Sequence, residues 1–273
     1  MSPDRTLVVI RERSFLDLLD LATIVVRRRP LVLAAWLALG TLPCVAFNAW
    51  VLGLMSDSNE EFPRFIPLFL LLAIEAPWAT APLTVAMGGL MFGNRPSAGR
   101  MVRTLFVSSG RMFLYQGLAR GALLLIWMIG AFFAGKFRFL NEVILLEQGK
   151  WSAVSSRCWD LTRDRGALMF FRWGFQLATC GLFVLAFAYA GSNLEELMVE
   201  QQTPELGVAS AGRVFEDLSL TSWHVHVSTW LGIGFFTVVR FLEYIDQRTR
   251  LEGWEIELRM RALGGALEDE ERW

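Results

Sequence analysis

The chain has 273 residues, of which 54% are hydrophobic and 13% aromatic, and its formal net charge is −1. This composition is more apolar than that of an average soluble domain and is typical of an integral membrane protein. The balanced charge and the lack of a basic groove lined by aromatic residues argue against a nucleic-acid partner. Three cysteines without a CxxC motif argue against a disulfide framework and against a zinc ribbon, and we expect no cofactor.

Residues 1–29 are expected to form a cytoplasmic amphipathic segment. Residues 14–26 predict a helix because their apolar side chains recur on one helical face, and we expect this helix to lie along the membrane interface. The basic run Arg27–Arg29 and Pro30 end it. The apolar face consists of Phe15, Leu18, Leu19, Ala22 and Val25.

Two apolar segments follow. Residues 30–55 carry no charge and are long enough to span a bilayer, and an acidic connector places their far end outside. Residues 65–93 predict a second span that is kinked or broken, because prolines interrupt the helical hydrogen-bond ladder. Glu75 lies near the middle of this span. It is either part of a proton or ion relay or a structural carboxyl bonded to backbone freed by Pro77 or Pro82, and we favour the structural interpretation.

Residues 94–112 carry four arginines and no acid, which indicates a cytoplasmic location. We expect an in-plane helix with its arginines toward anionic headgroups and its apolar stripe on the membrane, with a specific lipid-head or phosphate site as the alternative. The stripe consists of Met101, Leu105, Ser108 and Met112.

Residues 114–147 give conflicting topological signals. Residues 114–135 are long enough to cross the membrane, with Gly117 and Gly121 suited to close helix contact, yet residues 136–165 are basic enough to be cytoplasmic. A hairpin of short or re-entrant helices would resolve the conflict, and a single crossing that overrides the charge rule is the alternative. We favour the hairpin, whose returning limb carries Glu142 and Glu147.

The remaining chain predicts a second interfacial helix and two more spans. Ser152 is the expected N-cap of a helix whose apolar stripe is Val154, Cys158 and Leu161. Residues 167–191 form a span with Gly174 and Gly181 as packing points, and the acidic residues 192–221 lie outside. Residues 223–241 form the last span. His224 and His226 diverge on a helix and do not predict a metal site.

The C-terminal tail, residues 244–273, continues the last helix into the cytoplasm with oppositely charged residues four positions apart. FLNEVILLE at 139–147 and YIDQRTRLEGWEIEL at 244–258 resemble segments of uncharacterised bacterial multi-pass membrane proteins akin to the membrane domain of some glycerophosphodiester phosphodiesterases. The resemblance implies a bacterial cytoplasmic membrane protein and lends no phosphodiesterase activity. The residues that it covers are Glu142, Glu147, Tyr244, Asp246, Arg248, Arg250, Glu252 and Gly253.

The sequence therefore predicts an all-α integral membrane protein of the bacterial inner membrane, with both termini cytoplasmic. About five apolar segments, one of them broken or re-entrant, form the transmembrane domain at residues 30–243, between the cytoplasmic segments 1–29 and 244–273. No catalytic group is recognisable, so we expect a non-enzymatic scaffold or accessory subunit in the lipid bilayer, able to contact another membrane or cytoplasmic protein. The eight residues of the resemblance are candidate structural or docking residues. The alternative is a small transporter or permease component that uses the broken span around Glu75.

Overall fold

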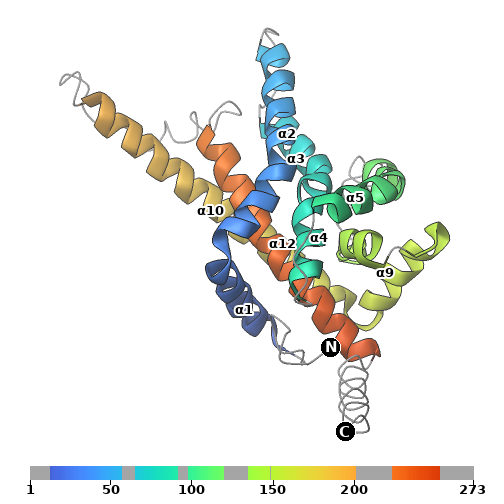
Figure 1. The fold of residues 1–273 in the computed structure, drawn as a ribbon. Helices are drawn as coiled ribbons and strands as arrows, with labels where there is room; N and C mark the ends of the chain where they lie inside the picture. Colours follow the sequence, from blue (N-terminus) through green and yellow to red (C-terminus); the bar gives the residue numbers. More distant parts are fainter. Residues whose placement is uncertain are drawn as a thin grey trace, which may run out of the picture.

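The computed structural model describes residues 13–56, 65–91, 98–119, 135–147, 149–200 and 223–252. Within these ranges the regular structure is entirely helical (Figure 1). Gly253 and the rest of the predicted tail lie outside the described residues. The longer elements are α1 (Phe15–Arg28), α2 (Pro30–Ser56), α3 (Phe65–Ala79), α4 (Ala81–Met91), α5 (Ala98–Met112), α9 (Val154–Thr162), α10 (Gly166–Glu200) and α12 (Trp223–Glu252).

Helix α1 begins with a capping box. Ser14 accepts a hydrogen bond from the backbone N–H of Asp17, and the Asp17 carboxylate accepts one from the backbone N–H of Ser14. Leu18, Ala22 and Val25 are buried, which confirms the predicted apolar face. This face packs on the protein, chiefly on α12, so α1 does not use it to lie on a membrane surface.

The second apolar segment is broken, as its prolines predicted. Helix α3 ends at Ala79 and α4 begins at Ala81, with Thr80 as a turn between them. The Thr80 hydroxyl donates a hydrogen bond to the carbonyl of Ala76, and the backbone N–H of Thr84 donates to the carbonyl of Thr80. These bonds occupy carbonyl groups around the break, where Pro82 has no N–H to donate.

The apolar stripe predicted on α5 faces the protein and not the membrane. Met101, Ser108 and Met112 are buried, because α5 packs against α4 and the short π-helix η3 (Val143–Glu147). The expectation for this stripe was wrong, since periodicity identifies an apolar face without identifying what covers it. Helix α5 continues into the π-helix η2 (Phe113–Ala119).

The segment that carries Glu142 and Glu147 is short and buried. It consists of α8 (Leu140–Glu142) and η3, and residues Leu140–Leu145 are all buried. The 3-10 turn η4 (Trp151–Ala153) leads into α9, whose Val154, Cys158 and Leu161 are buried as predicted. The predicted N-cap was wrong, because Ala153 holds that position and η4 starts before Ser152. A further 3-10 turn, η5 (Arg163–Arg165), connects α9 to α10.

Among the residues that the structure describes, three helices are long and apolar enough to cross a membrane, namely α2, α10 and α12. In Figure 1, α2 and α10 run upward, whereas α12 and the α3–α4 pair run downward. Helix α12 is the central element, because it packs against α1, α2, α4, α9 and α10 and most of its apolar stretch is buried. Helix α10 extends to Glu200, so residues 192–200, expected in a loop, are helical.

Glycine contacts occur on helices other than α10. A β-carbon at Gly40 would overlap the carbonyl oxygen of Ala79, and one at Gly234 would overlap the side chain of Leu37. These glycines let α2 approach α3 and α12 closely. The prediction for Gly174 and Gly181 was wrong, because an added β-carbon at either would meet nothing within 4 Å.

Candidate functional site

The charged residues at the C-terminal end of α12 form the densest polar region that the structure describes. Apolar residues dominate the helix up to Val239, after which the sequence RFLEYIDQRTRLE brings a charge to almost every turn. Several of these side chains are buried, among them Glu243 at 0% exposure and Asp246 at 3%. Buried charges are tolerated only when paired and hydrogen-bonded, so their partners define the site.

The first group is the buried arginine cluster, which consists of Arg138, Glu142, Arg172, Arg240 and Glu243. Arg138 Nε donates to Glu243 Oε2 over 2.7 Å, and Arg172 Nη1 donates to Glu243 Oε1 over 3.1 Å. Arg240 Nε donates to Glu142 Oε1 over 2.7 Å. Arg138 precedes α8 and Arg172 lies on α10. Glu243 therefore joins α12 both to α10 and to the segment before α8.

Three guanidinium groups face two carboxylates in this cluster. Glu142 and Glu243 are each 0% exposed, so their charges depend on the arginines for compensation. One oxygen of Glu142 and single N–H groups of Arg172 and Arg240 are buried without a hydrogen-bond partner among the described residues. The ring of Phe15 on α1 covers Arg172, with the guanidinium carbon 5.0 Å from the ring centroid.

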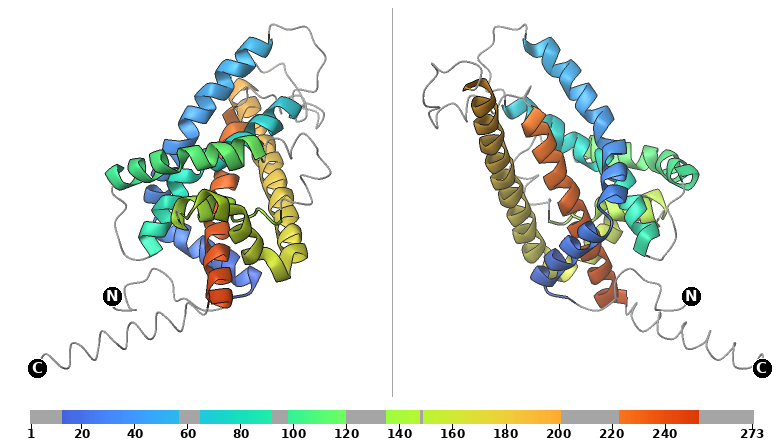
Figure 2. Two further views of the ribbon diagram at one scale, coloured as in Figure 1. Left: turned by 90° about the vertical axis from the view of Figure 1, so that its right-hand side faces the viewer. Right: turned by 60° about the vertical axis from the view of Figure 1, so that its left-hand side comes forward.

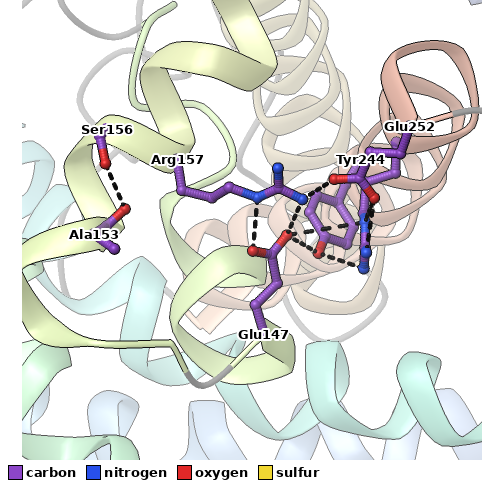
Figure 3. A network of polar contacts seen from close by, with 7 residues as sticks. Glu147, Ala153, Ser156, Arg157, Tyr244 and Glu252 are labelled. Carbon is purple, nitrogen blue, oxygen red and sulfur yellow. Dashed lines mark hydrogen bonds and ion pairs between the residues drawn. The ribbon is translucent and has the colours of Figure 1, made fainter.

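The second group is the tyrosine cluster, which consists of Glu147, Arg157, Tyr244, Arg248 and Glu252 (Figure 3). The Tyr244 hydroxyl donates to Glu147 Oε1 over 2.8 Å, and Arg157 donates to both oxygens of Glu147 over 2.8 and 3.1 Å. Arg157 also contacts Glu252, which receives a 2.8 Å hydrogen bond from Arg248. The cluster thereby joins η3, α9 and α12.

The arginine of α9 stays charged in this setting. Burial alone would lower the pKa of Arg157, but its hydrogen bonds to Glu147 and Glu252 raise that pKa above the ordinary value for arginine. Arg157 is therefore a permanent cation between two carboxylates.

The third group is the N-terminal clamp, formed by Arg13, Asp246 and Arg250. The backbone N–H of Arg13 donates to Asp246 Oδ1 over 2.8 Å. Arg250 donates to the backbone carbonyl of Arg13 over 2.7 Å and to Asp246 Oδ2 over 2.8 Å. The start of α1 is therefore held at the end of α12.

Glu75 lies apart from these groups. The Asn48 side-chain amide donates to Glu75 Oε2 over 2.8 Å, so the bond expected with proline-freed backbone is absent from the described contacts. A different amide binds backbone near the break, because Asn141 Nδ2 donates to the Pro77 carbonyl over 2.9 Å. Gln116 in turn donates to Asn141 Oδ1 over 3.0 Å, which links α3, η2 and α8.

The structure places most of the candidate residues from the sequence near the C-terminal end of α12, but it divides them among three separate groups. Glu147, Tyr244, Arg248 and Glu252 share the tyrosine cluster, Asp246 and Arg250 share the clamp, and Glu142 belongs to the buried arginine cluster. Sequence reasoning missed the residues that neutralise them. In the sequence, Arg138 and Arg157 contribute only to the basic character of residues 136–165, and Arg172 and Arg240 are not among the candidate residues. Their local sequence carries no signal that would have identified these partners.

The described residues contain no group of three or more His, Cys, Asp or Glu side chains that could hold a metal ion. The carboxylates of the two clusters bind arginine or tyrosine donors, and the Asp246 carboxylate of the clamp binds arginine and a backbone N–H. Cys158 is the buried thiol nearest to them, and burial raises its pKa well above the ordinary value, with the charges of Glu142 and Glu147 acting in the same direction. This thiol is protonated and a poor nucleophile.

No family model, no curated protein and no solved structure matches this chain.

Proposed function

We propose that the chain is a non-enzymatic multi-pass membrane scaffold or accessory subunit whose cytoplasmic side is organised by α12. The observation that supports this proposal most directly is that the charges of α12 are satisfied by neighbouring segments. Glu243 binds arginines that precede α8 and lie on α10, Tyr244 binds η3, and Asp246 binds the start of α1. Charges arranged in this way stabilise one packing of helices and leave few groups for chemistry.

Helix directions support a specific topology within this proposal. In Figure 1, α4 ends and α10 begins toward the lower end of the structure. Residues 92–165 would then make no net crossing, as in the hairpin interpretation. The lower end also holds Arg27–Arg29 and the clusters of α12, so the positive-inside rule makes it the cytoplasmic end of an inner-membrane protein.

The scaffold proposal is tested with the full chain purified in mild detergent from its own membrane and then reconstituted alone in vesicles. We expect a partner protein to remain bound at fixed stoichiometry and to be lost when Glu252→Arg disrupts the tyrosine cluster. Vesicles that contain the chain alone should show the same ion leak as empty vesicles. A chain that co-purifies with nothing, or that alone conducts ions or solutes, would contradict the proposal.

A small transporter or permease component is the second candidate. It is favoured by the break at Thr80 beside a polar pair, Glu75 and Asn48, between otherwise apolar helices. Flux through reconstituted wild-type chain that disappears in Glu75→Gln would support the transporter. Equal flux in the two proteins would count against a relay through Glu75.

A further inference from the structure

The outward face of α5 is apolar and aromatic even though the opposite face of the same helix is buried in the protein. Phe106 is 80% exposed, Val102 64% and Val107 55%. Phe113, the first residue of η2, is 59% exposed. A helix that covers the core with one face and exposes large apolar side chains on the other requires a second apolar contact.

Trp151 of η4 extends this face. Its indole lies against Gly110, where a β-carbon would be 3.0 Å from the ring. The Tyr115 hydroxyl donates a hydrogen bond to the Trp151 carbonyl and fixes η4 beside α5. Trp151 remains 52% exposed, so its ring adds to the outward surface one turn beyond Phe106.

The charges around these side chains are positive. Arg100 and Arg103 lie on the exposed face of α5, and Lys150 is exposed directly before Trp151. Residues 98–119 contain no acidic residue. We call the set Val102, Arg103, Phe106, Phe113, Lys150 and Trp151 the aromatic-basic surface.

The contacts of this surface link it, through η3, to the charged residues of α12. Arg111 Nη1 donates to the Gly149 carbonyl over 2.7 Å, immediately before Lys150. Glu147, two residues earlier, binds Tyr244. In the left view of Figure 2, α5 runs crosswise to α12. If α12 crosses a bilayer, α5 therefore runs along the plane of that bilayer.

We propose that the aromatic-basic surface rests in the headgroup region of a bilayer and prefers anionic phospholipid. Aromatic rings favour the boundary between acyl chains and headgroups, and guanidinium groups bind phosphate oxygens through paired hydrogen bonds. Juxtamembrane basic residues are attracted to anionic leaflets. The proposal shares the membrane location of the proposed function but requires no partner protein and no role for the α12 clusters.

The test uses the full chain in nanodiscs of phosphatidylcholine alone or mixed with phosphatidylglycerol. A nitroxide is attached at Phe106→Cys, in a background of Cys44→Ala and Cys180→Ala, and its collisions with oxygen and with an aqueous nickel chelate are compared. The matched control is Asp160→Cys, an exposed position on α9. We expect the label at 106 to collide with oxygen and the label at 160 to collide with nickel.

Lipid preference is measured with spin-labelled phosphatidylglycerol and phosphatidylcholine competing for the same protein. Arg103→Gln should reduce the preference for phosphatidylglycerol by up to roughly five-fold, the effect expected for one basic residue at an anionic surface, and Arg103→Lys should retain it. A label at 106 that is reached mainly by nickel would overturn the proposal. So would a label shielded from both reagents, which would indicate a protein contact, or a lipid preference unchanged by Arg103→Gln. None of these results depends on whether Glu252 retains a partner, so the two proposals can fail separately.

Discussion

The hydroxyl of Tyr244 donates a 2.8 Å hydrogen bond to the carboxylate of Glu147, which lies 97 residues earlier in the chain. This bond joins the last helix to the short buried segment between α5 and α9. Tyr244 is 1% exposed, so its hydroxyl donates to Glu147 and not to water. The pair connects the two segments that the sequence singled out.

Tyr244→Phe should lower the free energy of unfolding by about 1.5–3 kcal/mol, the usual contribution of a hydrogen bond to a charged group. Unfolding in mixed micelles with increasing denaturing detergent measures the change. Together with Glu147→Gln and the double variant, Tyr244→Phe forms a double-mutant cycle. A coupling energy near zero between the two positions would contradict the direct bond.

Glu243→Gln should be more damaging than Glu252→Gln. Glu243 is fully buried and binds two arginines, so its neutralisation leaves Arg138 and Arg172 without a carboxylate partner, at a cost of about 3–5 kcal/mol. The Glu252 side chain is 25% exposed, and its loss should cost about 1 kcal/mol or less. Similar stabilities for the two variants, measured by the same unfolding assay, would refute this ranking.

Gly40→Ala should destabilise the fold by about 1–3 kcal/mol, because the new methyl group overlaps the Ala79 carbonyl where α2 meets α3. Gly174→Ala is the matched control, since its β-carbon would meet nothing within 4 Å. We expect the control to change stability by less than about 0.5 kcal/mol. Thermal unfolding in one detergent compares the two variants, and a larger loss for Gly174→Ala would contradict the packing described.

Cys158 should resist maleimide in the folded protein across pH 7 to 9. The thiolate is the reactive form, and burial raises the pKa of this thiol so that deprotonation is unfavourable throughout that range. Unfolding in detergent should restore the labelling rate of an ordinary cysteine. The measurement uses Cys44→Ala with Cys180→Ala, in which Cys158 is the one remaining thiol, and rapid labelling before unfolding would contradict the burial of α9.

Arg250→Gln should release the start of α1 without disturbing the tyrosine cluster. The substitution removes the donor to the Arg13 carbonyl and the partner of Asp246. Amide hydrogen exchange should accelerate in residues 15–28 and stay unchanged in residues 154–162. Reversing the pair, with Asp246→Arg and Arg250→Glu, should restore stability only in part, because the backbone N–H of Arg13 would face a cation.

Local features of the chain were predictable from sequence. The break between α3 and α4 follows from prolines, and the pairs Asp246–Arg250 and Arg248–Glu252 are one helical turn apart. Glu142 and Glu147 were recognisable because acids are unusual in an apolar helix. Each of these inferences needed only neighbours in the sequence.

Long-range relationships were not predictable in the same way. The arginines that neutralise Glu243 lie 105 and 71 residues away, and nothing in their local pattern distinguishes them from interfacial arginines. The predictions for the apolar stripe of α5 and for the glycines of α10 were wrong for a related reason. The spacing of residues shows that a helix face is apolar or carries small side chains. The topology decides whether protein or lipid covers that face.

The clamp between Arg13 and Asp246 has a consequence for biosynthesis. These residues are 233 positions apart, so the ribosome must translate α12 before the first helix can be fastened. Glu142 and Glu147 likewise wait for Arg240 and Tyr244, which appear about a hundred codons after them. A nascent chain halted before α12 therefore holds Glu142 without its arginine and a loose amino terminus, which makes truncated products natural targets for membrane quality-control proteases.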